Sequence, residues 1–206
     1  MYKVLVTGFE PFRNYSENSS WVVAEEVVRH PIEGVVISAE QMPVSFGRVE
    51  ISLCNAVERH TPDLLILLGQ SGDCDRIKLE RTALNLMDAK FADNDLYLPD
   101  EEIIDNSGET ALFTNLPIKR LYSSIAEQNV RVKISNSCGL YVCNRLYYAA
   151  LKMVKDRSSI KVIFMHLPLY EGQTVINTGK ATMPLSDMVK AVQTVIKEIN
   201  DKDRRI

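Results

Sequence analysis

An uninterrupted apolar run at residues 64–68 constrains the fold of this chain more than any other feature. A strand with one solvated face alternates apolar and polar residues, whereas a continuous run of this kind is typical of a parallel strand buried on both faces. Burying both faces of a sheet requires a layer of helices on each side. The run, as part of a strand over residues 63–68, therefore predicts an α/β protein.

Strand and helix patterns alternate along the rest of the chain. The other predicted strands are apolar or alternating and lie at residues 3–7, 35–39, 77–79, 130–134 and 159–165. The predicted helices have an apolar face with helical spacing and lie at residues 19–29, 46–60, 117–128, 146–153 and 183–200. This order predicts a three-layer sandwich in which a mostly parallel central sheet is flanked by helices.

The length of the chain predicts one domain over residues 1–206. A domain of this size buries roughly 70% of the surface that its unfolded chain exposes. Residues 88–108 are polar and rich in turn residues, and they are too many for an ordinary connection. We expect them to form a functional flap or a small hairpin arm.

The charge and hydropathy of the chain exclude several classes of partner. The net charge is -3, the isoelectric point is near 5.7, and no block of Lys and Arg stands out, so we expect no binding to nucleic acid or to anionic membranes. No apolar run approaches the roughly 18 residues of a membrane span. The first residues lack the apolar core and cleavage site of a signal peptide. These features predict a cytoplasmic protein.

The sequence offers little material for a metal site. The four cysteines, at positions 54, 74, 138 and 143, lack the paired short spacings of a zinc site, and the chain has three histidines. In a reducing compartment we expect all four cysteines to be free thiols. We therefore expect no metal and no other cofactor.

A polar turn with a single glycine separates the predicted strand at residues 130–134 from the helix that follows. If Cys143 falls in the first turn of this helix, the positive end of the helix dipole stabilises its thiolate. Such a position is typical of a nucleophile. The alternative is that Cys143 is a small buried apolar residue, as free cysteines often are.

Two further polar residues lie at the ends of predicted elements. The apolar phase breaks at Glu80, where a bulge or bend could aim the carboxylate inward, although a surface ion pair with its neighbour explains the same letters. His166 follows the last predicted strand directly, whereas His30 and His60 close helices and are interpreted as structural. Together with Cys143, these residues supply the nucleophile, base and orienting carboxylate that a cysteine hydrolase needs.

Aromatic residues gather in the loop predicted after the first strand, at residues 8–15. Phe9 and Phe12 could be ordinary core residues. They are also candidates for a pocket wall, because ligands of α/β sheets bind beyond the carboxyl ends of the strands. The loop contains one glycine, Gly8, whereas a dinucleotide-binding fingerprint needs three, so the pattern argues against a nucleotide site.

The motifs together resemble those of the pyroglutamyl peptidase I (pyrrolidone-carboxylate peptidase) family, the cysteine peptidases that remove an N-terminal pyroglutamate. The resemblance runs over nearly the whole chain, and its most specific block is residues 141–144, around Cys143. The other matching blocks are residues 4–12, 69–72, 80–85, 88–89, 93–94, 116–119, 135–137 and 166–168.

This resemblance implies roles for individual residues. Cys143 would be the nucleophile, His166 the base and Glu80 the third member of a triad. Substrate would be bound by aromatic walls around the lactam ring, by an amide near it and by part of the flap, namely by Phe9, Phe12, Gln70, Lys90, Phe91 and Val142. The family is known for homotetramers that need no metal, so the resemblance also implies a homo-oligomer that acts on peptides with an N-terminal pyroglutamate.

The chain departs from the family pattern around the pocket and the flap. Arg13 and Asn14 stand where the family has two glycines, Asp73 and Cys74 where it has Gly-Arg, Lys90 where it has arginine, and Cys138 where it has alanine. These departures leave two alternatives open. One is a cysteine amidase of the same fold with a different acyl specificity, and the other is a catalytically silent binding homologue.

Overall fold

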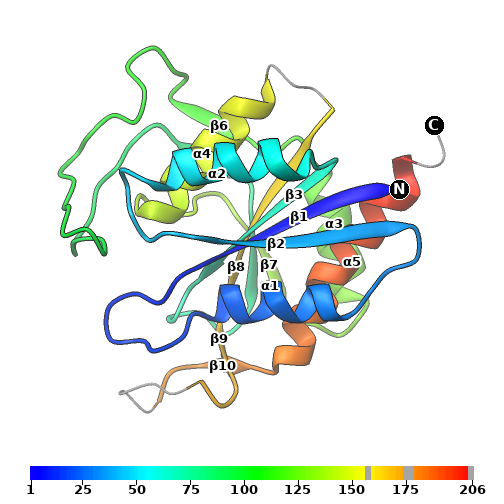
Figure 1. The fold of residues 1–206 in the computed structure, drawn as a ribbon. Coiled ribbons are helices and arrows are strands. Elements are labelled where there is room, and N and C mark those ends of the chain that lie inside the picture. The colour runs from blue at the N-terminus through cyan, green and yellow to red at the C-terminus, as the bar shows by residue number, and fades with distance from the viewer. Residues whose placement is uncertain (156–158, 174–178, 204–206) are drawn as a thin grey trace.

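A six-stranded sheet forms the centre of the computed structural model, which describes residues 1–155, 159–173 and 179–203 (Figure 1). Its strands stand in the order β2-β1-β3-β8-β4-β7. Their bounds are Tyr2–Phe9 (β1), Val35–Met42 (β2), Leu64–Gln70 (β3), Ile77–Glu80 (β4), Val132–Ser135 (β7) and Lys161–Leu167 (β8). The strands β1, β2, β3 and β8 are parallel, whereas β4 and β7 run parallel to each other and antiparallel to β8. The sheet is therefore mostly parallel, as predicted.

Helices cover both faces of this sheet (Figure 1). The helices α1 (Ser19–Arg29), α3 (Ile118–Ala126) and α5 (Leu185–Asp203) pack on one face, and α2 (Val49–His60) and α4 (Val142–Lys155) pack on the other. The central strand β3 serves both cores, because alternate residues of a strand point to opposite faces. Leu64, Ile66 and Leu68 enter the first core, and Leu65 and Leu67 enter the second. The predicted three-layer α/β fold is confirmed.

Short strands lie outside the central sheet. The strands β5 (Thr82–Leu84) and β6 (Ala111–Phe113) pair antiparallel, and β9 (Leu169–Tyr170) and β10 (Thr182–Met183) pair parallel. Between β5 and β6 the chain makes one isolated antiparallel bridge, from Met87 to Glu102. The role of residues 88–108 as a flap or arm stays a prediction.

Several element boundaries differ from those predicted. The strand β1 continues to Phe9 because it pairs with β2 as far as Met42, so the first two residues of the predicted loop belong to the sheet. Likewise, His166 lies inside β8 rather than after it, because β8 pairs with β3 as far as Leu167. The last helix begins at Leu185, after Met183 has paired in β10.

All four cysteines carry free thiols. In the described part of the chain, no helix combines the length and the hydropathy of a membrane span.

Candidate active site

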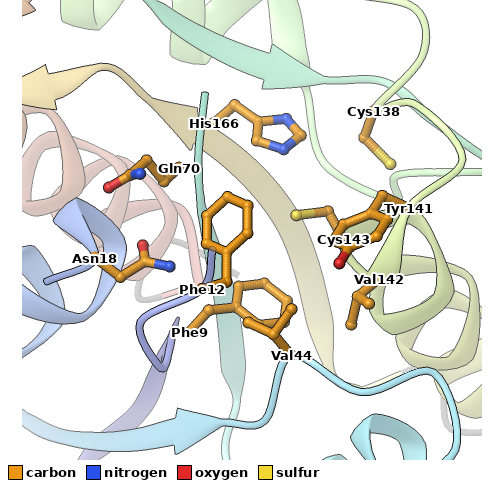
Figure 2. A pocket seen from close by; sticks show the side chains of 10 residues that line it. All are labelled: Phe9, Phe12, Asn18, Val44, Gln70, Cys138, Tyr141, Val142, Cys143 and His166. Atoms are coloured by element: carbon orange, nitrogen blue, oxygen red, sulfur yellow. The ribbon is translucent and has the colours of Figure 1, made fainter. Parts of the chain in front are cut away.

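A cavity of about 140 Å³ opens at the carboxyl ends of β1, β3 and β8 (Figure 2). Its lining combines a mainly apolar wall with a few polar side chains, from Phe9, Phe12, Asn18, Val44, Gln70, Cys138, Tyr141, Val142, Cys143 and His166. This edge is where ligands of open α/β sheets bind, because the loops that leave the parallel strands surround it. It contains Cys143 and His166 together with four of the six predicted substrate-binding residues.

His166 is hydrogen-bonded to a buried carboxylate from the neighbouring antiparallel strand. In the register of β8 and β4, Lys78 stands opposite His166 and Glu80 stands opposite Phe164. Glu80 and His166 are thus diagonal neighbours on one face, a separation that long side chains span. Glu80 Oε1 lies 2.8 Å from His166 Nδ1, and the Glu80 side chain is fully buried. The alternative of a surface ion pair for Glu80 is therefore wrong.

The absence of a side chain at residue 69 makes room for the imidazole. Gly69 stands opposite His166 in the register of β3 and β8. A Cβ atom at this position would lie 2.8 Å from the Phe164 ring and 3.0 Å from His166 Cδ2. The Phe164 ring itself packs against the imidazole, with a centroid distance of 4.8 Å. Gly69 and Phe164 together restrict the plane of the His166 ring.

The surroundings of His166 favour its protonated form. Burial lowers its pKa, but hydrogen bonds and charge interactions with Cys143 and Glu80 outweigh this effect and raise the pKa to about 9. At neutral pH the surroundings therefore favour the imidazolium form of His166.

Cys143 is the second residue of α4, and its sulfur points into the cavity (Figure 2). Gly139, with a φ of 81°, supplies the left-handed turn between β7 and this helix. Asn144 then anchors the start of the helix, because its side chain accepts a hydrogen bond from the Leu84 N–H and donates to the carbonyls of Leu84 and Leu86. Cys143 therefore stands in the first turn of α4, at the positive end of the helix dipole.

Gln70, the last residue of β3, has a defined amide orientation. The Ser19 N–H donates to Gln70 Oε1 over 2.8 Å, and Gln173 Nε2 donates to the same oxygen over 2.8 Å. Gln70 Nε2 is buried and finds no hydrogen-bond partner in the described part of the chain. Figure 2 shows Gln70 with its amide oxygen turned away from the cavity. The amide therefore keeps one unused donor at the wall of the cavity.

Lys90 and Phe91 lie apart from this lining in the described structure. Lys90 is exposed, and Phe91 is half-exposed, with the Arg13 guanidinium carbon 3.9 Å from its ring centroid. Arg13 holds this contact from a left-handed backbone conformation, with a φ of 56°, that glycine adopts more easily. The role predicted for Lys90 and Phe91 in substrate binding stays a prediction.

Sequence reasoning left four lining residues out of the site. Asn18 caps the start of α1 through its side-chain oxygen, Val44 follows β2, and Cys138 and Tyr141 flank the turn before α4. The position of Asn18 just before the predicted helix was a signal for a cap, but not for a pocket. The other three carry no local pattern that separates a pocket wall from a core.

The remaining histidines have local partners, as their interpretation as structural residues requires. His30 Nε2 lies 3.1 Å from Glu26 Oε1, and His60 Nε2 lies 2.7 Å from Glu40 Oε1. No cluster of His, Cys, Asp and Glu side chains suited to a metal ion occurs among the described residues.

Comparison with known proteins gives a consistent result over nearly the whole chain. The family model described as pyroglutamyl peptidase matches residues 2–202. Pyrrolidone-carboxylate peptidase 1 of Caldanaerobacter subterraneus subsp. tengcongensis is 38% identical over 198 residues, which cover 96% of this chain and 97% of that protein. Two solved structures are similar in fold. Pyrrolidone carboxyl peptidase from Thermococcus litoralis has a TM-score of 0.92 at 31% identity, and the match covers 98% of this chain and 96% of that chain. Pyroglutamyl peptidase I from Bacillus amyloliquefaciens has a TM-score of 0.89 at 32% identity and covers 94% of each chain.

Proposed function

Because the chain belongs to the pyroglutamyl peptidase family, and is therefore a hydrolase of the cysteine-peptidase type, we propose that it removes N-terminal pyroglutamate from peptides through a triad of Cys143, His166 and Glu80. The observation that carries this proposal is the meeting of three distant segments at one cavity. The sulfur of Cys143 and the imidazole of His166 share the lining, and the buried Glu80 holds His166 from behind at 2.8 Å.

The proposed reaction begins with a thiolate–imidazolium pair. His166 takes the proton of Cys143, and the thiolate is stabilised by the imidazolium and by the start of α4. The thiolate attacks the carbonyl carbon that joins pyroglutamate to the next residue. Backbone N–H groups at the start of α4, including that of Cys143, stabilise the resulting oxyanion.

Collapse of this intermediate completes the first half of the reaction. His166 gives its proton to the leaving amine as the C–N bond breaks, and a thioester of pyroglutamate remains on Cys143. His166 then takes a proton from water, the hydroxide attacks the thioester, and pyroglutamic acid leaves as the thiol is restored. Glu80 holds the imidazole in one tautomer and stabilises its charged form throughout. The mechanism uses no metal and no cofactor.

The cavity suits the lactam ring in size and polarity. A cavity of about 150 Å³ accommodates a benzene ring, so one of about 140 Å³ has room for a five-membered lactam. Phe9, Phe12 and Val142 offer apolar surface to the ring, and Gln70 Nε2 offers a donor to its carbonyl. No carboxylate belongs to the described lining, so a free N-terminal ammonium would find no counter-ion there.

The first test of this proposal compares acyl groups. We expect the wild type to hydrolyse a fluorogenic pyroglutamyl amide at least about 10³-fold more efficiently than the prolyl amide, because a site built to hydrogen-bond a carbonyl rejects an analogue that lacks it. Glutaminyl and acetyl-alanyl amides in the same panel test the alternative of a different acyl specificity. Equal kcat/KM values for the prolyl and pyroglutamyl amides would leave only an unspecific cysteine amidase, and no turnover of any amide would favour the silent homologue.

A second test uses the pH dependence of the reaction. The pKa of His166 is raised from its ordinary 6.5 to about 9. The imidazolium is therefore lost as the pH rises through about 9. The contribution of its partners to the free energy of unfolding is present in full below pH 6.5 and is lost over the same rise in pH. We expect kcat/KM for the pyroglutamyl amide to fall on an alkaline limb near pH 9, because the imidazolium both supports the thiolate and protonates the leaving amine. A profile that stays flat to pH 10 would contradict this role of His166.

We also propose that the protein is a cytoplasmic homo-oligomer, a tetramer by its resemblance to the family. Exposed apolar side chains support an interface on the predicted arm. Of the large apolar residues that lie exposed, five fall between residues 91 and 103, namely Phe91, Leu96, Tyr97, Leu98 and Ile103. A second copy of the chain would cover such a patch.

A further inference from the structure

Gln173 is a buried polar residue whose contacts reach the candidate active site. It lies in the turn after β9, seven positions beyond His166, and only 7% of its surface is exposed. Burying an amide is costly unless its hydrogen bonds are made. The partners of Gln173 therefore indicate what its burial serves.

Two backbone groups fix the orientation of the Gln173 amide. The Tyr170 N–H donates to Gln173 Oε1 over 3.3 Å, and Gln173 Nε2 donates to the carbonyl of Glu17 over 3.1 Å. A backbone N–H can only donate and a backbone carbonyl can only accept. If the amide were flipped, its nitrogen would face the Tyr170 N–H and its oxygen would face the Glu17 carbonyl. The orientation is therefore fixed, and it is the nitrogen of Gln173 that contacts the side chain of Gln70.

Gln70 is fixed in turn by two donors. The Ser19 N–H and Gln173 Nε2 both donate to Gln70 Oε1, each over 2.8 Å. The oxygen is thereby held away from the cavity, and the Gln70 nitrogen is left buried and unpartnered among the described residues. Whether Gln70 places a donor or an acceptor at the cavity wall thus depends on its contacts with Ser19 and Gln173.

We propose that Gln173 is a positioning residue that locks the Gln70 amide with its donor toward the cavity, and so makes the enzyme selective for acyl groups with a ring carbonyl. This inference rests on the proposed function and deepens it. Gln173 does not line the cavity itself, so its effect passes through Gln70. Without Gln173, one donor remains on the Gln70 oxygen and the amide is free to tilt or turn.

The main experiment is a double-mutant cycle with Gln173→Met and Gln70→Met, assayed on the pyroglutamyl and prolyl amides. Methionine keeps the approximate length of the side chain and removes its hydrogen bonds. We expect Gln173→Met to raise KM for the pyroglutamyl amide about 5- to 10-fold with little change in kcat, the effect of one lost hydrogen bond. We expect Gln70→Met to lose about 10²-fold in kcat/KM because the cavity donor itself is gone. The double variant should be no worse than Gln70→Met, since a residue that acts only through Gln70 has nothing left to position.

A second variant tests whether the orientation of the Gln70 amide determines substrate preference. Gln173→Glu, assayed at pH 8, replaces the donor by a carboxylate that can only accept, and so draws the Gln70 nitrogen away from the cavity. We expect a loss of about 10- to 100-fold in kcat/KM for the pyroglutamyl amide and an equal fall in its preference over the prolyl amide. The matched control is Gln193→Glu, which removes a donation to the His30 carbonyl on the surface and should leave both kinetic constants unchanged.

Two further measurements separate positioning from damage. The rate of Cys143 alkylation by iodoacetamide should be the same in the wild type and the Gln173 variants, because the Cys143–His166 pair is left intact. Losses that multiply in the Gln70→Met/Gln173→Met double variant, or a Gln173→Glu variant that keeps the full pyroglutamyl preference, would overturn the inference while the proposed function stands. Equal rates of the wild type on the two amides would overturn the lactam pocket itself, and this inference with it.

Discussion

Replacing Cys143 by serine is expected to lower kcat/KM for a pyroglutamyl amide by about 10⁵-fold, because removal of a catalytic nucleophile abolishes nearly all of the chemical step. A serine hydroxyl at this position has nearly the shape of the thiol, but it is far less acidic and gives His166 no anion to pair with. The measurement is steady-state hydrolysis of the fluorogenic amide. Thermal unfolding of the variant checks that it is folded. The variant should also bind substrate, because the lining other than the sulfur is unchanged.

The other cysteines provide the controls for this prediction. Cys54 and Cys74 lie outside the cavity lining, so the variants Cys54→Ser and Cys74→Ser should keep most of the activity. Burial raises the pKa of the Cys138 thiol well above its ordinary value, and the charges of Glu80 and Cys143 add to this effect. Cys138 is therefore a poor nucleophile at neutral pH. We expect the variant Cys138→Ala to keep most of the activity. Wild-type turnover by Cys143→Ser, or selective alkylation of Cys74, would show that the nucleophile has been assigned to the wrong residue.

Replacing Glu80 by glutamine is expected to cost up to about 10⁴-fold in kcat, since the loss of an orienting carboxylate can cost a catalytic triad this much. Glutamine preserves the shape of the buried side chain but removes the charge that faces His166 Nδ1 at 2.8 Å. The pKa of His166 should fall, because Glu80 is one of the two groups that raise it. The alkaline limb of the pH profile should accordingly move below that of the wild type.

The double variant Glu80→Gln/His166→Ala distinguishes a shared function from two separate ones. If Glu80 acts through His166, the double variant should be little worse than His166→Ala alone, because members of a triad are not additive. Two losses that multiply would mean that Glu80 mainly supports the fold, for example where β4 ends and the chain leaves the central sheet for β5. Thermal unfolding of each single variant separates that outcome from a loss of catalysis.

Much of the architecture follows from local patterns in the sequence. The apolar run at residues 64–68 predicted a strand buried on both faces, and its residues do alternate between the two cores of the sandwich. Cys143 was predicted between a strand and a helix, at or near the start of the helix, and it is the second residue of α4. These properties are readable because burial and helical periodicity repeat over a few neighbouring residues, which a single sequence displays.

The residue types of the candidate triad could be predicted from the sequence, but their geometry could not. It predicted His166 after the last strand, whereas pairing with β3 holds it inside β8. It left the direction of the Glu80 side chain open, and the antiparallel register of β4 and β8 decides it by placing Glu80 diagonally opposite His166. The two residues are 86 positions apart, and no local pattern encodes a register between strands so distant in the chain.

The polarity of the pocket depends on contacts between distant parts of the chain. The sequence places Gln70 in the turn just after a predicted strand, and the resemblance to a family places it near the substrate. Its amide orientation is set by Ser19 and Gln173, which lie 51 and 103 positions away in the chain. Sequence periodicity records whether a side chain is buried, because burial is an average over its surroundings. The direction of a single hydrogen bond depends on individual partners, and these are brought together only when the sheet and its loops have closed around them.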